Sequence, residues 1–232
     1  MDRSLTKGRA QRATKGSGGP SRGLVTVLEP AGAASEAYRT LGANLLHGPV
    51  DKPPKVVVVT SLGLVEGKSA TCANLGVVLA QADQSTLIMD CNLHEPTMAG
   101  FFGLPNFFGV ANVLTGERDL PQVWQEQLPG LKVATAGPLP PKPPAELLGS
   151  GRFAELVGRV RQEFDYVLID SPPMGQVSDP LLLATRGDGV LLVLEAKKTR
   201  KRPLLESQRS LEAVGANILG TVVTHLKDGQ SR

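Results

Sequence analysis

The chain has 232 residues, of which 41% are hydrophobic and 20% charged, and its formal net charge is +3. This length allows a sizeable core, and two cysteines are too few for a disulfide-rich secreted scaffold. No apolar run approaches the roughly 18–20 residues that span a bilayer, and the N-terminus lacks the apolar segment of a secretory signal. We therefore expect a cytoplasmic protein.

The positive charge is concentrated at the N-terminus. Residues 1–23 contain six basic residues and one acidic residue and few apolar ones, so we expect a disordered basic tail followed by one domain over 24–232. The tail is either a solvated extension or an arm for anionic lipid or an acidic partner. Without it the body is slightly acidic, which does not favour nucleic acid as a partner.

Predicted helices and strands alternate along the body. A helix is predicted over 35–47, with Ser35 as a candidate cap, and a strand over 55–60, whose four valines are typical of burial on both faces. Further strands are predicted at 85–90, 131–135, 165–170, 189–195 and 218–224, and helices at 68–81, 107–114, 145–148, 152–164, 179–185 and 202–214. The alternation predicts a three-layer α/β fold, with a mostly parallel sheet and helices on both faces.

The segment 60–69, TSLGLVEGKS, lies between a predicted buried strand and a predicted helix. Backbone N–H groups and a helix N-terminus at such a turn attract phosphate, a lysine reaches the terminal phosphates, and a serine hydroxyl binds Mg²⁺. The candidate ATP-binding residues are Gly63, Glu66, Gly67, Lys68, Ser69 and Ala70. Leu62 occupies the position of the first glycine of the strict pattern, so an ordinary strand-to-helix turn is the alternative.

Two aspartates end predicted buried strands. Asp90 follows an apolar segment and Asp170 ends the segment VLID, which SPP follows. Carboxylates at the carboxyl ends of parallel strands face the ligand crevice, so we expect both beside the phosphate loop. An isolated aspartate at a strand end is often only a turn or capping residue.

Several segments together resemble one family. They are SEAYRTL at 35–41, EGKS at 66–69 with ANL at 73–75, LIMD at 87–90, PAELL at 144–148, and DYVLIDSPP at 165–173 followed by Asp179. In this order they resemble the bacterial tyrosine kinases that regulate capsule and exopolysaccharide synthesis. That family belongs to the P-loop group that also contains septum-site and partition ATPases.

The resemblance implies a role for each matching residue. Lys68 and Ser69 match the lysine and the metal-binding hydroxyl of the phosphate loop, and Asp170 matches the carboxylate that holds Mg²⁺. Asp90 matches a carboxylate that helps to activate the attacking tyrosine hydroxyl. Glu36 and Arg39 match the start of an oligomerisation motif.

The resemblance also implies cofactors and partners. The cofactors are ATP and Mg²⁺, with Lys68, Asp90 and Asp170 as catalytic residues and Ser69 and Asp170 as metal ligands. The partners are the cytosolic segment of a membrane polysaccharide co-polymerase or adaptor, protein tyrosine substrates and further copies of the chain. Such a partner would recruit the protein to the inner face of the plasma membrane.

Other positions depart from the family pattern. Val65 replaces a glycine of the phosphate loop, Asn92 replaces a second carboxylate, and His94 replaces an arginine. Gly42 replaces the second arginine of the oligomerisation motif. The C-terminal tyrosine cluster of the family is absent.

Three functions therefore stay open. The first is an active protein-tyrosine kinase. The second is a catalytically weakened nucleotide-binding regulator of polysaccharide export, to which the departures point. The third is a partition or septum-site ATPase, which Gly63 disfavours because those relatives carry a lysine at that position.

Overall fold

The structure is a computed structural model, and it describes residues 21–48, 53–64 and 66–226. Seven strands form one sheet in the order β3-β4-β2-β5-β1-β6-β7. Every neighbouring pair is parallel except β3 with β4. The strands are β1 (Val56–Ser61), β2 (Thr86–Asp90), β3 (Trp124–Leu128), β4 (Leu131–Ala134), β5 (Tyr166–Asp170), β6 (Gly189–Glu195) and β7 (Ile218–Thr224).

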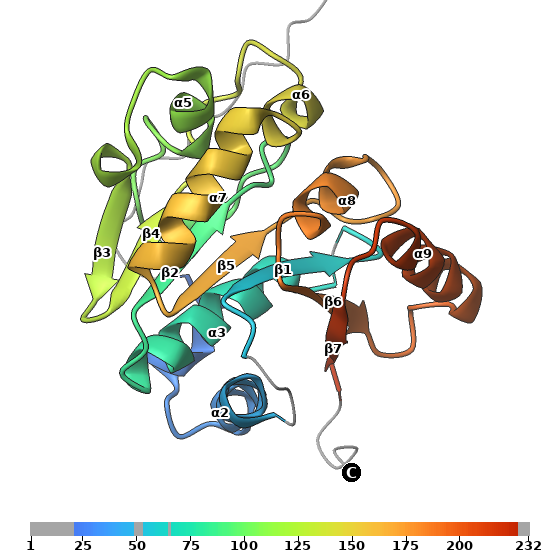
Figure 1. Cartoon of the computed structure of the whole chain (residues 1–232). Coiled ribbons are helices and arrows are strands. Elements are labelled where there is room, and N and C mark those ends of the chain that lie inside the picture. Colours follow the sequence, from blue (N-terminus) through green and yellow to red (C-terminus); the bar gives the residue numbers. More distant parts are fainter. Residues whose placement is uncertain (1–20, 49–52, 65, 227–232) are drawn as a thin grey trace, which may run out of the picture.

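Helices cover both faces of the sheet (Figure 1). α7 and α8 lie on one face, and α2 and α3 lie on the other. The helical elements are α1 (Val25–Leu28), α2 (Ala33–His47), α3 (Lys68–Gln81), α4 (Met98–Phe102), α5 (Val110–Thr115), the 3₁₀ turn η1 (Leu120–Gln122), α6 (Pro144–Leu148), α7 (Gly151–Glu163), α8 (Asp179–Ala184) and α9 (Lys201–Ala213). The predicted three-layer α/β fold with a mostly parallel sheet is confirmed.

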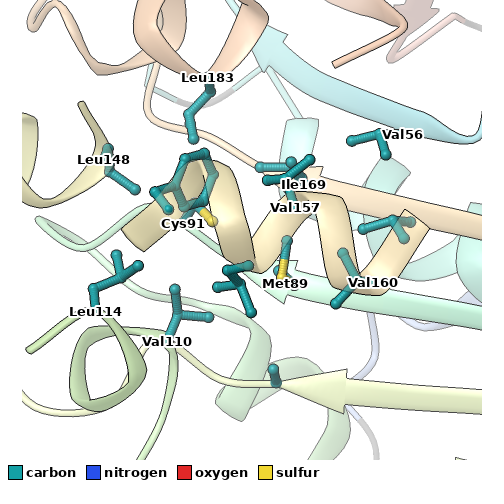
Figure 2. Close-up of a cluster of buried hydrophobic side chains, with 14 of the residues drawn as sticks. Val56, Met89, Cys91, Val110, Leu114, Leu148, Val157, Val160, Ile169 and Leu183 are labelled. Atoms are coloured by element: carbon teal, nitrogen blue, oxygen red, sulfur yellow. The ribbon is translucent and has the colours of Figure 1, made fainter. Parts of the chain in front are cut away.

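The strand sequences explain why the sheet is enclosed. Side chains alternate between the faces of a strand, so Val56 and Val58 enter the core under α7, while Val57 and Val59 enter the core under α3. All four have no exposed surface. Figure 2 shows the first of these cores, where Met89 and Ile169 of the central strands lie near Val157 and Val160 of α7.

Some predicted elements differ from the observed ones. The helix expected at 107–114 begins only at Val110, and α1, α4, η1 and β3 were not predicted. The prediction that Ser35 caps α2 is wrong. The N-cap of α2 is Gly32, and the Ser35 hydroxyl instead donates to the carbonyl oxygens of Val25 and Glu29.

The N-terminal part of the domain is attached beside α4 and α3. The Ser21 N–H donates to the Phe101 carbonyl oxygen at 2.9 Å, and Asn74 of α3 donates to the Gly23 carbonyl oxygen at 2.8 Å. Most of the basic tail predicted at 1–23 lies outside the described residues. Across the described ranges, no helix is both long and apolar enough to cross a membrane.

Candidate nucleotide site

The loop between β1 and α3 forms a candidate phosphate site. Gly67 is the N-cap of α3 and has φ +83°, a left-handed conformation that glycine adopts without strain. The first N–H groups of a helix have no partner within it, so those of Lys68, Ser69 and Ala70 can bind an anion. Val65, whose effect on this loop was in question, lies outside the described residues.

A chain of polar contacts links Lys68, Ser69 and Asp170. The Lys68 ammonium donates to the Ser69 hydroxyl at 2.9 Å, and that hydroxyl donates to Asp170 Oδ2 at 2.7 Å. The Lys68 Nζ also lies 3.5 Å from Asp170 Oδ1. All three side chains are buried. Burial raises the pKa of Asp170, and the Lys68 charge opposes that rise.

Asp90 lies directly beside Asp170, because the two residues pair across β2 and β5. Its Oδ2 accepts the N–H groups of Thr97 and Met98 at 3.0 Å each, and thereby anchors the start of α4. Burial, followed by the negative charge of Asp170, raises the pKa of Asp90 to about 7. Asp90 is therefore a carboxyl group that changes protonation near neutral pH.

In the loop after β2, Asn92 and His94, two of the residues that depart from the family pattern, make side-chain contacts. Asn92 closes a turn, because its side chain donates to the Glu95 carbonyl oxygen at 2.7 Å and accepts the Glu95 N–H at 3.3 Å. His94 Nε2 lies 3.0 Å from Asp179 Oδ2 at the start of α8. The Asp179 carboxylate thus holds the imidazole at the edge of the site.

A cavity of about 470 Å³ opens above the start of α3. Of the predicted ATP-binding residues, Gly67, Lys68, Ser69 and Ala70 line it, whereas Gly63 and Glu66 do not. The two carboxylates predicted to be catalytic, Asp90 and Asp170, have no exposed surface. The other lining residues are Leu64, Asn92, His94, Glu95, Thr97, Phe101, Pro172, Pro173, Gln176, Val177 and His225.

Sequence reasoning assigned no site role to most of these lining residues. Pro172 and Pro173 lie two and three residues after Asp170, and that position was a usable signal. Phe101 belongs to a short helix that the sequence pattern did not predict, and His225 follows the last strand. Nothing local in the sequence indicated that either residue lines the cavity.

Ser69, which lines the cavity, and Asp170, which it contacts, fit a divalent metal ion. Asp170 Oδ1 is buried and, apart from the Lys68 ammonium 3.5 Å away, has no polar partner among the described residues. The Ser69 hydroxyl lies beside the same carboxylate. Hydroxyl and carboxylate oxygens are ligands that Mg²⁺ prefers. Within the described part of the chain, no cluster of three histidine, cysteine or acidic side chains offers a complete metal site, so other ligands would come from nucleotide and water.

The predicted oligomerisation residues lie on α2, which covers α3 (Figure 1). Arg39 Nη1 donates to Glu36 Oε2 at 2.9 Å, and its Nη2 donates to the Pro30 carbonyl oxygen at 2.6 Å. Glu36 is well exposed. Gly42, which stands where the family has the second arginine of the motif, is buried against α3.

Relatives of known class cover most of the chain. Tyrosine-protein kinase YwqD of Bacillus subtilis is 36% identical over 207 residues, which are 89% of this chain and 87% of the relative. Putative tyrosine-protein kinase CapB of Staphylococcus aureus is 31% identical over 199 residues, 85% of this chain and 87% of the relative. No protein-family model matches the chain.

Solved structures agree with this relationship. The crystal structure of the chimeric protein CapA2B2 is 31% identical and has a TM-score of 0.84, with 89% of this chain and 91% of that chain covered. The kinase domain of the Escherichia coli tyrosine kinase ETK is 29% identical and has a TM-score of 0.82, with 90% and 84% covered. A septum site-determining protein of Pyrococcus horikoshii, at 19% identity and a TM-score of 0.64 over 77% and 72%, shares the fold. The chain therefore belongs to the family of bacterial tyrosine-protein kinases.

Proposed function

We propose that this chain binds Mg-ATP in the cavity above α3 and transfers the γ-phosphoryl group to tyrosine residues of other proteins. The observation that carries this proposal is the chain of contacts from Lys68 through Ser69 to Asp170 at the cavity floor. Phosphoryl transfer depends on positioning and charge neutralisation, and these groups supply both.

Binding requires Lys68 to change partners. Its ammonium now contacts Ser69 and Asp170, and we expect it to turn towards the phosphates, where the N–H groups at the start of α3 also point. Ser69 and Asp170 would then hold Mg²⁺. A bound Mg²⁺ neutralises charge that develops on the transferring phosphoryl group.

Asp90 is the proposed proton acceptor. The γ-phosphorus–oxygen bond to ADP breaks, a bond forms from the tyrosine oxygen to phosphorus, and the tyrosine proton passes to the Asp90 carboxylate. A pKa of about 7 suits a general base at neutral pH. Because Asp90 has no exposed surface, this role requires the residues around it to move first.

The acceptor tyrosine belongs to another protein in this proposal. The chain contains two tyrosines, Tyr38 and Tyr166. Tyr166 is 4% exposed at the start of β5, at the opposite end of that strand from Asp170. Tyr38 is half-buried on α2, and burial raises the pKa of its hydroxyl. Neither side chain is presented as a free acceptor.

The family suggests the biological setting. Relatives include the putative tyrosine-protein kinase EpsB of Ralstonia solanacearum, and CapA2B2 is a chimera related to this chain. We propose a role in capsular or exopolysaccharide polymerisation and export, recruitment to the inner membrane face by the cytosolic segment of a co-polymerase or adaptor, and self-association through α2.

The direct test measures binding and transfer separately. Titration calorimetry with Mg-ATP and Mg-ADP should show binding that Lys68→Ala weakens about ten- to hundredfold, because charge-assisted contacts to phosphate are lost. Transfer of label from γ-labelled ATP to a Glu-Tyr copolymer should be lost as well. Lys142→Ala, an exposed lysine outside the cavity lining, is the matched control.

A nucleotide-binding regulator is the second candidate. It is favoured by the closed arrangement in which Lys68 contacts Asp170 and Asn92 uses its side chain to close a turn. This candidate predicts binding lost in Lys68→Ala but no transfer, even with the cognate adaptor segment added. Robust label transfer would exclude it, and absence of both binding and transfer would contradict both candidates.

A further inference from the structure

The carboxylate of Glu66 accepts hydrogen bonds from backbone N–H groups of the phosphate loop. Its Oε2 accepts the Leu62 N–H at 2.7 Å and the Gly63 N–H at 3.0 Å, so it closes the loop across residues 62–66. The residue is 7% exposed and does not line the cavity. Glu66 therefore shapes the loop rather than offering a surface to the nucleotide.

The other oxygen of the same carboxylate binds a residue far along the chain. Thr199 Oγ1 donates to Glu66 Oε1 at 2.9 Å across a separation of 133 residues. Thr199 lies between β6 and α9, where its hydroxyl oxygen accepts the Glu195 N–H at 3.0 Å. Because that oxygen already accepts one bond, its own proton is directed to Glu66. The orientation of the Thr199 hydroxyl is thus fixed from both sides.

A second threonine, Thr224, packs against Glu66 and Gly67 of the same loop. Thr224, at the end of β7, donates to the Glu66 carbonyl oxygen at 2.8 Å. A Cβ atom added to Gly67 would lie 3.3 Å from Thr224 Cγ2, so the loop packs closely against this strand end. The segment between β6 and α9 and the end of β7 therefore hold the phosphate loop on the side away from β5.

From these contacts we infer that Thr199 is a positioning residue for phosphate binding. It holds the Glu66 carboxylate, and through it the loop, in the shape that receives the phosphates before the nucleotide arrives. When only a fraction of molecules has the competent shape, the apparent dissociation constant rises by the inverse of that fraction. This inference rests on the nucleotide binding proposed above, and it gives the segment between β6 and α9 a part in the site.

The test removes the hydroxyl without changing the volume. Thr199→Val should weaken Mg-ADP binding about tenfold in titration calorimetry, the loss expected for one hydrogen bond to a charged group. Thr199→Ser keeps the hydroxyl and should bind within about twofold of the unmodified chain. Thr185→Val is the matched control, since the Thr185 hydroxyl donates to the Leu182 carbonyl oxygen at the end of α8 and Thr185 is not among the residues that line the cavity.

A double-mutant cycle assigns the effect to Glu66. In a Glu66→Ala background, Thr199→Val should cause little further loss, because the contact is already gone. An equal loss in both backgrounds would overturn the inference, as would binding by Thr199→Val within about twofold of the unmodified chain.

Hydrogen exchange tests the inference without nucleotide. In the free protein, Thr199→Val should speed exchange of the peptide that covers residues 60–68, whereas Thr185→Val should not. Unchanged exchange in this peptide would overturn the inference even if the chain bound no nucleotide. A chain that binds no Mg-ADP but shows faster exchange in Thr199→Val would contradict the proposed function, and Thr199 would then hold the loop without a part in phosphate binding.

Discussion

Two buried carboxyl groups lie side by side at the centre of the site. Asp90 and Asp170 are neighbours across adjacent strands, and one lysine, Lys68, contacts Asp170. Two like charges in an apolar interior are unfavourable, so the pair retains a proton more readily than separate aspartates would. The arrangement keeps one carboxyl group ready to exchange a proton near pH 7.

Because of the raised pKa of Asp90, the free energy of unfolding should depend on pH. The pKa of Asp90 rises from 3.8 to about 7 on folding, so between these values the folded state binds more protons than the unfolded state. Stability should therefore fall as pH rises from about 4 to about 7 and then level off. Asp90→Asn lacks this slope. The free energy of unfolding of Asp90→Asn minus that of the unmodified chain should therefore grow by up to about 4 kcal/mol as pH rises from about 4 to about 7.

Urea unfolding at pH 5 and pH 8 would measure this difference. Asp165→Asn is a useful control, because hydrogen bonds from Ser85 lower the pKa of that exposed aspartate. Asp165 is therefore ionised in both the folded and the unfolded state at pH 5 and at pH 8, and the difference between Asp165→Asn and the unmodified chain should not change with pH. A constant difference between Asp90→Asn and the unmodified chain at both pH values would mean that Asp90 titrates normally. The same variant should bind Mg-ADP but lose phosphoryl transfer if Asp90 accepts the proton.

The sequence predicts which residues enter the site better than it predicts their partners. Lys68, Ser69 and Asp170 were expected together, and the structure brings them within hydrogen-bonding distance. The contact of His94 with Asp179 and that of Glu66 with Thr199 join residues far apart in the sequence. Such pairings depend on which loops meet at the edge of the sheet, and no local pattern encodes them.

At the scale of elements, the contact between α2 and α3 depends on one small residue. A Cβ atom on Gly42 would lie 2.8 Å from Val78 Cγ1, closer than the van der Waals distance, and valine has little freedom to move aside. Gly42→Ala should therefore lower the free energy of unfolding by about 1 kcal/mol, because overpacking outweighs the better helix propensity of alanine.

The matched control lies on α7. Gly158 is also inside a helix, but a Cβ atom there would meet nothing within 4 Å. Gly158→Ala should raise the free energy of unfolding by about 0.5–1 kcal/mol through helix propensity alone. If chemical denaturation gave both substitutions the same sign, close packing at Gly42 would not be the cause.

The central strands were predicted more reliably than the edge strand β3 and the short helix α4. The central strands consist of apolar runs that are buried on both faces, as in β1. β3 (Trp124–Leu128) is a half-exposed antiparallel edge strand with polar residues, and it lacks that signal. The start of α4 depends on N–H bonds to Asp90, a partner outside the helix, so its own sequence indicates it poorly.

At the scale of the whole molecule, the site depends on segments from both ends of the chain. The phosphate loop lies between α3, which anchors residues near Gly23, and the end of β7, where Thr224 contacts Glu66. His225 then lines the cavity. The proposed phosphate loop is therefore held by contacts with residues far from it in sequence.

Self-association through α2 is the remaining prediction at this scale. The ion pair of Glu36 and Arg39 is exposed, so within one chain it is worth at most about 1 kcal/mol. If a neighbouring copy recognises it, Arg39→Ala should lower the molar mass measured by light scattering and leave the thermal midpoint nearly unchanged. Arg202→Ala removes another exposed pair, with Glu206, and should leave the mass unaltered. If the unmodified chain and Arg39→Ala had equal molar mass at every concentration, the ion pair would have a role only within one chain.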